Sequence, residues 1–280
     1  MSDFAQPPNY SVDPEVEASM APRPDTARLF RELHREELLL LANAWDAGSA
    51  HLIESLGAKA IATTSAGVAR SHGYTDGNLL PVPLLAATVA EIARVVIVPI
   101  TADAEGGYSN DPAVVGDAVA ALIAAGAVGI NLEDGDGDPA LLCAKIECAK
   151  KAGVRLGVDL FVNARVDVYL RHLAPSERRL DETVARAERY RAAGADGIFV
   201  PALTEAAEIR AIAEAVPLPL NVLVWPGLPP ASELRALGVR RLSAGSWIAS
   251  AAYAQAASRA AAFLRTGDPG PLTEDARVYS

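Results

Sequence analysis

Acidic side chains follow two neighbouring apolar runs in this sequence, at the point where each run ends. Asp103 and Glu105 follow one run two positions apart, and Glu133 follows the next run along the chain. If these runs are adjacent parallel strands, the three carboxylates meet at one edge of the sheet and repel one another unless a cation lies among them. Carboxylates without histidine or cysteine favour Mg²⁺ or Mn²⁺ over Zn²⁺ as that cation.

These acids could bind a metal either directly or through water. Mg²⁺ usually keeps several waters, so one carboxylate bound directly and others acting through water would be sufficient. The alternative is that each acid caps a following helix or pairs with an arginine. Three acids at adjacent strand ends favour the metal.

Two other strand ends supply groups that bind anions. Arg165 offers a planar fork of donors suited to a carboxylate or a phosphonate, and a salt bridge to Glu133 or Glu105 is compatible with that role. The segment Thr64–Gly67 follows another apolar run and can present backbone N–H groups to an anion. We therefore expect the acids to share their site with an anionic substrate.

Other reaction types lack the residues that they need. The four lysines lie at the start of a predicted strand or on a predicted helix, which argues against a Schiff-base aldolase. The four histidines form no metal-binding pair, and neither a G-x-S-x-G motif nor a P-loop occurs. The two cysteines, Cys143 and Cys148, cannot form a disulfide scaffold.

Composition and charge exclude several partners. The chain has 280 residues, of which 51% are hydrophobic and 21% charged, as in globular proteins. A net charge of −10 without a basic run argues against binding to nucleic acid or to an anionic membrane. The apolar run 38–42 is too short to cross a bilayer, and residues 1–25 lack the pattern of a signal peptide. We therefore expect a soluble, cytoplasmic protein.

The elements that must position these residues alternate regularly. Short β-branched runs and Ala-rich amphipathic stretches follow one another between residues 26 and 265, which is typical of βα units on a parallel sheet. Eight strands are predicted, at 38–43, 59–63, 97–103, 128–133, 159–165, 197–201, 218–224 and 241–244. Helices are predicted at 46–56, 83–94, 111–125, 139–152, 178–193, 205–215, 231–237 and 246–265.

Eight strands, each followed by a helix, predict an α/β fold of the (β/α)8 TIM-barrel type over 26–265. A doubly wound sheet would instead place a G-x-G-x-x-G turn after its first strand, and none is present there. Residues 1–25 are expected to form a tail or arm, and 266–280 a C-terminal tail. The last helix is rich in small residues on nearly every side, which suits a subunit interface or close packing against its own barrel.

Five segments resemble, in order, motifs of the isocitrate lyase and phosphoenolpyruvate mutase superfamily. Asp103-Ala-Glu-Gly-Gly-Tyr108 is similar to the D-x-[DE]-x-G-Y-G signature, and Leu132-Glu-Asp134 matches the "LED" of the following strand. Asn163-Ala-Arg165 matches the arginine of the strand after that. The segments 43–50 and 64–69 look like the first two strand ends of the same family.

The resemblance implies a Mg²⁺-dependent (or Mn²⁺-dependent) enzyme that binds a 2-oxo acid or its enolate. It also implies a homo-oligomer, a dimer or a tetramer, whose subunits exchange the last helix. Its catalytic residues would be Asp103, Glu133 and Arg165. The residues that it assigns to the metal are Asp103, Glu105, Glu133 and, in an outer role, Asp76. The residues that it assigns to the substrate are Trp45, Thr64, Ser65, Ala66, Asp103, Arg165 and Asn221.

The chain also departs from the named members of that family. The cysteine loop K-[KR]-C-G-H of the lyases is replaced by the short stretch 135–139, and the Lys-Thr-Asn-Ser loop of the mutases is absent. We hypothesise a lyase that cleaves a C–C bond in a small 2-oxo or 2-hydroxy di- or tricarboxylate. The alternatives are P–C bond chemistry on a phosphonopyruvate-type substrate, and a 2-oxo-acid-binding protein without turnover.

Overall fold

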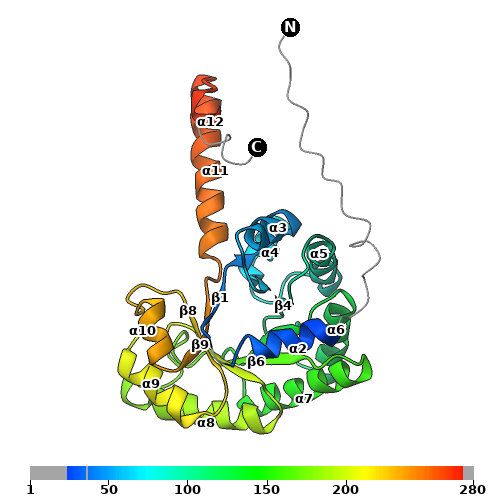
Figure 1. Cartoon of the computed structure of the whole chain (residues 1–280), viewed down its shortest axis with the longest axis vertical. Coiled ribbons are helices and arrows are strands. Elements are labelled where there is room, and N and C mark those ends of the chain that lie inside the picture. The colour runs from blue at the N-terminus through cyan, green and yellow to red at the C-terminus, as the bar shows by residue number, and fades with distance from the viewer. Residues whose placement is uncertain (1–23, 36, 274–280) are drawn as a thin grey trace.

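Nine short parallel strands form one sheet that curls into a barrel (Figure 1). The computed structural model describes residues 24–35 and 37–273. Strand β1 (Leu39–Leu41) pairs with β9 (Val239–Ser243), and β2 (Asn43–Ala44) pairs with β3 (Ile61–Thr63). One strand interrupted at Ala42 therefore closes the ring, and the predicted TIM-type barrel is confirmed.

The remaining strands follow one another round the barrel in chain order, each beside its neighbour in sequence. Each overlaps the apolar run predicted for it. They are β4 (Ile100–Asp103), β5 (Gly129–Glu133), β6 (Phe161–Arg165), β7 (Gly197–Val200) and β8 (Leu220–Leu223).

Helices follow the strands and pack around the barrel, largely where the sequence predicts them. Two of them begin with the same local signal, Asp-Pro, in which the aspartate accepts a hydrogen bond from the second helical residue. Asp111 accepts from Ala113 N–H at 2.9 Å, and Asp138 accepts from Ala140 N–H at 2.8 Å. The helices are α3 (Ala47–Ser55), α5 (Val82–Val95), α6 (Pro112–Ala124), α7 (Pro139–Arg155), α8 (Arg179–Ala192), α9 (Ala206–Ala215), α10 (Ala231–Ala236) and α11 (Trp247–Thr266).

Four short elements go beyond the sequence prediction. They are α2 (Pro24–Glu32), α4 (Ser65–Ser71), the 3₁₀ turn η1 (Ser176–Arg178) and α12 (Gly270–Thr273). Helix α2 begins inside the segment predicted as an arm, whose first 23 residues lie outside the described residues, as do the last seven of the predicted C-terminal tail. Phe30 of α2 packs edge-to-face on Phe161 of β6, with ring centroids 5.4 Å apart.

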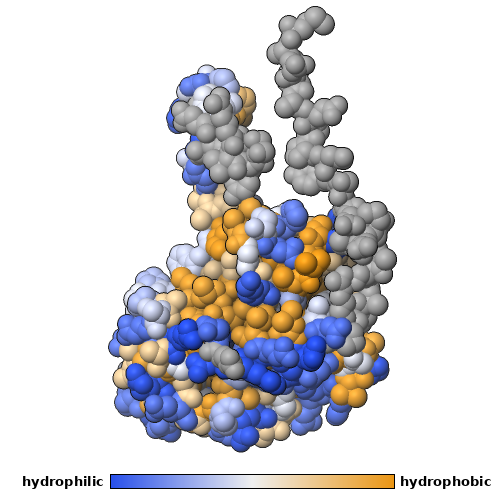
Figure 2. Space-filling view, in the orientation of Figure 1, coloured by the Kyte–Doolittle hydropathy of each residue, from blue (hydrophilic) through white to orange (hydrophobic). Residues whose placement is uncertain are grey.

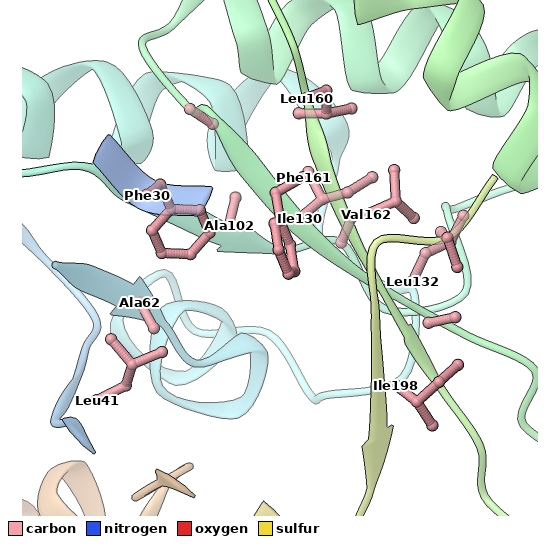
Figure 3. Packing of buried hydrophobic residues seen from close by; sticks show 14 of the residues in the cluster. Phe30, Leu41, Ala62, Ala102, Ile130, Leu132, Leu160, Phe161, Val162 and Ile198 are labelled. Carbon is pink, nitrogen blue, oxygen red and sulfur yellow. The ribbon is translucent and has the colours of Figure 1, made fainter. Parts of the chain in front are cut away.

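Apolar side chains of the strands and of α2 form one continuous core. Ala102, Ile130 and Phe161 meet Phe30 there (Figure 3). At the carboxyl ends of the strands the buried side chains become polar, and Asn43, Asn131, Asn163, Asn221 and Ser243 are all buried. The fold thus brings polar groups from many strands to one end of a closed barrel.

Helix α11 projects away from the barrel (Figure 1). Several of its large apolar side chains are exposed, and Leu264 is 83% exposed. The barrel face near its base also carries broad apolar areas (Figure 2). Among residues 24–35 and 37–273, none of the helices is both long and apolar enough to cross a bilayer.

Candidate active site

A cavity of about 220 Å³ opens at the carboxyl ends of the strands, and we call it the main cavity. Six of the ten predicted site residues line it. They are Thr64, Ser65, Ala66, Asp76, Asp103 and Arg165. Asn43, Asn131 and Ser243 add polar groups to its wall, and Phe199, Leu223 and Trp225 add apolar ones.

The turn after β3 is the start of helix α4. Thr64 is extended (φ −121°), and the helix begins at Ser65, so the first N–H groups of α4 have no partner within the helix. Ser65 N–H donates to Asp103 Oδ2 at 3.2 Å, and Asp103 N–H donates to Thr63 Oγ1 at 2.8 Å. The end of β3 and the end of β4 are therefore tied together, and Ala66, which lines the cavity, stands where an anion would be favoured.

Asp103 presents a buried carboxylate oxygen that fits a cation. Within the described residues its Oδ1 has no hydrogen-bond partner, although a buried carboxylate oxygen normally has one. Asp76 lies in the same cavity wall. Burial raises the pKa of Asp76 and the negative charge of Asp103 raises it further, whereas a hydrogen bond from the Ser65 side chain lowers it. A divalent cation at Asp103 would lower the pKa of Asp76 again, because its positive charge favours the ionised carboxyl group.

The described residues do not bring three acidic, histidine or cysteine side chains together closely enough to surround one ion. The arrangement therefore fits a metal site in which Asp103 binds the ion directly and the other carboxylates contact it through bound water molecules. All of these candidate ligands are oxygen groups, which suits Mg²⁺ or Mn²⁺.

Glu105 points into the adjoining loop and does not line the main cavity. Its carboxylate accepts from Gly77 N–H at 2.8 Å, from Asn78 N–H, and from the Tyr108 hydroxyl at 3.0 Å. Burial raises the pKa of Glu105, and the bonds from Asn78 and Tyr108 lower it. Asn78, Glu105 and Tyr108 all have positive φ, between 47° and 61°, so this loop holds local backbone strain beside the site.

Glu133 is held by Arg165. Their side chains form an ion pair of 2.6 Å, and both are largely buried. Burial raises the pKa of Glu133 to about 7. The positive charge of Arg165 lowers this pKa, and the negative charges of Asp103, Asp167 and Glu105 raise it. The sequence analysis allowed for a salt bridge between Arg165 and Glu133 and found it compatible with substrate binding by Arg165.

Arg165 is fixed from a second side by Asp167, which the sequence analysis missed. Nε and Nη2 of Arg165 donate to the two oxygens of Asp167 at 2.6 and 3.1 Å. Burial alone would lower the pKa of Arg165, but Glu133 and Asp167 raise it, so the guanidinium stays charged. Partners in the described part of the chain thus use three of its five N–H donors, and one remains on each Nη for a ligand. Asp167 lies two positions after Arg165, and that spacing is the signal that could have found it.

Two predicted substrate residues lie behind or beside the cavity wall. Asn221 is fully buried, and its Oδ1 accepts from the hydroxyl of Ser243, which lines the cavity. Trp45 packs close to Gly67 of α4, and its ring lies 6.5 Å from that of Tyr253 on α11. The structure therefore places Trp45 between the site and the last helix.

A buried arginine beneath the cavity was also missed. Arg241 is 1% exposed, and its Nη2 donates to Asn131 Oδ1 at 3.1 Å. Burial lowers the pKa of Arg241 to about 9, opposed by the negative charge of Asp103. The sequence shows it only as the second of two adjacent arginines at a strand, where alternation directs one outward and the other inward.

The family model described as phosphoenolpyruvate phosphomutase matches residues 30–264 of the chain. An oxaloacetate decarboxylase of Paraburkholderia xenovorans is 32% identical over 244 residues, covering 81% of this chain and 77% of that protein. A 2,3-dimethylmalate lyase of Eubacterium barkeri is 32% identical over 227 residues, covering 76% and 78%. A Burkholderia cenocepacia crystal structure, provisionally assigned as a phosphonomutase, is 41% identical with a TM-score of 0.79, covering 88% of this chain and 99% of that one.

Proposed function

Since the chain belongs to the phosphoenolpyruvate mutase/isocitrate lyase superfamily, we propose that it is a Mg²⁺-dependent lyase that cleaves a C–C bond in a small 2-oxo or 2-hydroxy di- or tricarboxylate. The observation that carries the proposal is the buried Oδ1 of Asp103, which has no hydrogen-bond partner among residues 24–35 and 37–273. It lies in the wall of the same cavity as the start of α4 and the two free donors of Arg165. A relative that acts on oxaloacetate and another that acts on dimethylmalate support a small carboxylate as substrate.

Asp103 would hold the metal directly, and Asp76, Glu105 and Glu133 would act on it through water. When bound, the metal would supply a positive charge that favours the negative charge of an enolate. The residues of this chain supply the rest of the binding site.

The amides at the start of α4 and the Arg165 guanidinium are placed to bind the two ends of an oxo acid. The Ser65 and Ala66 segment would take the carboxylate next to the oxo group. The Ser65 N–H is engaged by Asp103, but the N–H groups that follow it have no partner within the helix and lie at the positive end of the helix dipole. Arg165 would hold the departing carboxylate-bearing fragment with its remaining donors. The ion pairs to Glu133 and Asp167 fix the guanidinium before substrate arrives, so little ordering is needed on binding.

The test is incubation of the purified protein with Mg²⁺ and a panel of 2-oxo, 2-hydroxy and phosphono acids, followed by proton and phosphorus NMR, with EDTA as the metal-free control. We expect loss of one carboxylate only when Mg²⁺ is present. Asp103→Asn should abolish that loss while leaving the circular dichroism spectrum unchanged. Asp117→Asn changes an exposed aspartate on α6 and should retain activity. Full activity of Asp103→Asn would refute the assignment.

A second candidate is P–C bond chemistry by the same site. It is favoured by the match to the phosphomutase family model and by the similarity to the Burkholderia cenocepacia structure. A metal-dependent change in the phosphorus signal of a phosphonopyruvate-type acid would select it over the lyase. Metal-dependent binding of an oxo acid with no product in any spectrum would instead select a binding protein without turnover.

We also propose that the chain assembles into a dimer or tetramer through α11. The helix extends away from its own barrel, and Trp247, Phe263 and Leu264 expose between 43% and 83% of their surface. An apolar groove of about 430 Å³ beside β1 and α3, which includes Leu40 and Leu56, offers a surface that an apolar helix face could cover.

A further inference from the structure

Arg241 is a buried cation that takes no part in the proposed binding of metal or substrate. It lies on β9 two positions before Ser243, and the burial of this strand alternates, so both side chains point into the barrel. Ser243 lines the main cavity, whereas Arg241 is only 1% exposed and does not line it. The guanidinium therefore lies beneath the cavity wall.

Two polar side chains connect Arg241 with the main cavity. Its Nη2 donates to Asn131 Oδ1 at 3.1 Å, and its Nε donates to Ser243 Oγ through a long bond of 3.5 Å. Asn131 and Ser243 both line the cavity. The same Asn131 oxygen also accepts from Asn163 Nδ2 at 2.9 Å. Because its oxygen is engaged by two donors, Asn131 has its amide N–H groups rather than its oxygen left for a ligand.

The charge of Arg241 is not balanced by a carboxylate in contact with it. Arg165 and Arg186 each form ion pairs with two carboxylates. Arg241 is more deeply buried than either, yet within residues 24–35 and 37–273 it forms no ion pair, and its Nη1 has no hydrogen-bond partner. A buried charge without a partner lowers stability, and such a cost is expected at a functional site rather than in a purely structural core.

The charge of Arg241 acts on the proposed metal ligand. Burial lowers the pKa of Arg241 to about 9, and the negative charge of Asp103 opposes this change, so the guanidinium stays charged at neutral pH. Arg241 is enclosed by protein, where charges interact over longer distances than in water. A cation at Asp103 is therefore repelled by Arg241, and an anion in the main cavity is attracted by it.

We propose that Arg241 supplies a fixed positive charge beneath the main cavity, which favours a bound carboxylate or enolate and opposes binding of the free metal ion. This inference rests on the proposed function, because it assumes that the cavity holds a divalent cation and a 2-oxo acid. Arg241 does not line the cavity, so it is a positioning residue. It acts through its charge and through the orientation of the Asn131 amide.

The test removes the charge and measures the two ligands separately. Arg241→Met is neutral, and Arg241→Gln is neutral but retains a donor for Asn131. Electron paramagnetic resonance gives the affinity for Mn²⁺ alone. Isothermal titration calorimetry at saturating Mn²⁺ gives the affinity for oxalate, a planar dianion that resembles the enolate of a 2-oxo acid. In both variants we expect Mn²⁺ to bind about threefold or more tightly and oxalate about threefold or more weakly than in the wild type.

Two further measurements separate the charge from packing. Arg240→Met changes the neighbouring arginine, whose side chain points to the other face of β9, and should leave both affinities unchanged. The melting temperature of Arg241→Met, followed by circular dichroism, should be unchanged or higher than that of the wild type. No carboxylate of the described residues loses an ion-pair partner in this variant, so no charge is left buried and unpaired.

Opposite shifts of the two affinities distinguish a charge from a structural role. If both ligands bind more weakly to the variants and the melting temperature falls, Arg241 serves packing and the inference is refuted. Wild-type affinities in Arg241→Gln, or the same shifts in Arg240→Met, would also refute it, while the proposed function stands. If the wild-type protein binds neither Mn²⁺ nor oxalate, the proposed function fails and the inference fails with it.

Discussion

Asp167 binds Arg165 through both of its carboxylate oxygens, at 2.6 and 3.1 Å, and is itself completely buried. The planar guanidinium is therefore held in one orientation, with its remaining donors on the two Nη atoms. Nη1 of Arg165 forms an ion pair with Glu133 Oε2 at 2.6 Å. A guanidinium held by two carboxylates can present its last two donors to a ligand without first being ordered.

Asp167→Asn should weaken oxalate binding about tenfold or more, because the amide can accept only one of the two bonds from Arg165 and turns an N–H group toward its donors. Binding of Mn²⁺ alone, measured by electron paramagnetic resonance, should change little, since Asp167 is not among the proposed ligands. Asp196→Asn is the matched control. Asp196 is also largely buried and pairs with Arg31 and Lys150, so this variant should lose stability yet bind oxalate as the wild type does. Unchanged oxalate affinity in Asp167→Asn would contradict the positioning role.

His34 makes the fold sensitive to acid. Its ring is buried and stacks on Phe161 with centroids 4.3 Å apart, and its Nδ1 donates to the carbonyl of Phe30 at 2.7 Å. Burial and the positive charges of Arg241 and Arg31 lower the pKa of His34 to about 3. The folded protein therefore binds fewer protons here than the unfolded chain, so stability is present above pH 6.5 and is lost as the pH falls toward 3.

Lowering the pH from 7 to 4.5 should cost roughly 2 kcal/mol of unfolding free energy through His34 alone. Urea denaturation at the two pH values measures this loss. His34→Phe keeps an aromatic ring against Phe161 and should show a smaller loss over the same interval. His51→Gln changes an exposed histidine and should follow the wild type. If acid lowers the unfolding free energy of His34→Phe as much as that of the wild type, groups other than His34 cause the acid sensitivity.

Gly67 of α4 has no room for a side chain. A Cβ there would lie 2.7 Å from Thr64 Cγ2 and 2.9 Å from Trp45 Cβ. Gly67→Ala should therefore destabilise the protein by about 1–3 kcal/mol and weaken oxalate binding, because the start of α4 must shift. Gly48→Ala is the matched change in α3, where the nearest atom is Asp46 Oδ1 at 3.6 Å. That variant should be neutral or more stable by up to about 1 kcal/mol in thermal unfolding.

The barrel was predictable from the sequence because its strands are buried on both faces and its helices have clear start and stop signals. Most residues of the runs 128–133 and 159–165 are apolar, and Asp-Pro marks the start of α6 and of α7. Helix α4 was missed because its seven residues are too few to show a period, and α2 because it follows a Pro-rich stretch. The split of the first strand depends on pairing with two different neighbours, which no local pattern shows.

The site was predictable where a side chain leaves a strand end, as Asp103 and Arg165 do. It was not predictable where a side chain reaches the site from elsewhere. Lys145 lies on a helix and reaches the loop at Gly106 by its length alone, so its position in sequence indicates only a helix. Glu105 leaves the strand end at a residue with φ 47°, which turns its carboxylate toward Gly77 and Asn78. That reversal of direction follows from the backbone conformation of the loop.

The exposed face of α11 predicts self-association. Leu264 is 83% exposed near the end of a 20-residue helix that stands away from its own barrel. In sedimentation velocity at micromolar concentration, the 29.2 kDa chain should sediment as a dimer or tetramer. Leu264→Glu should shift it toward the monomer, because a charge would have to be buried in the interface. Val154→Glu is the matched control, since Val154 is 81% exposed on α7, and it should leave the assembly unchanged. A wild-type monomer, or an assembly that survives Leu264→Glu, would contradict a role for this end of the helix.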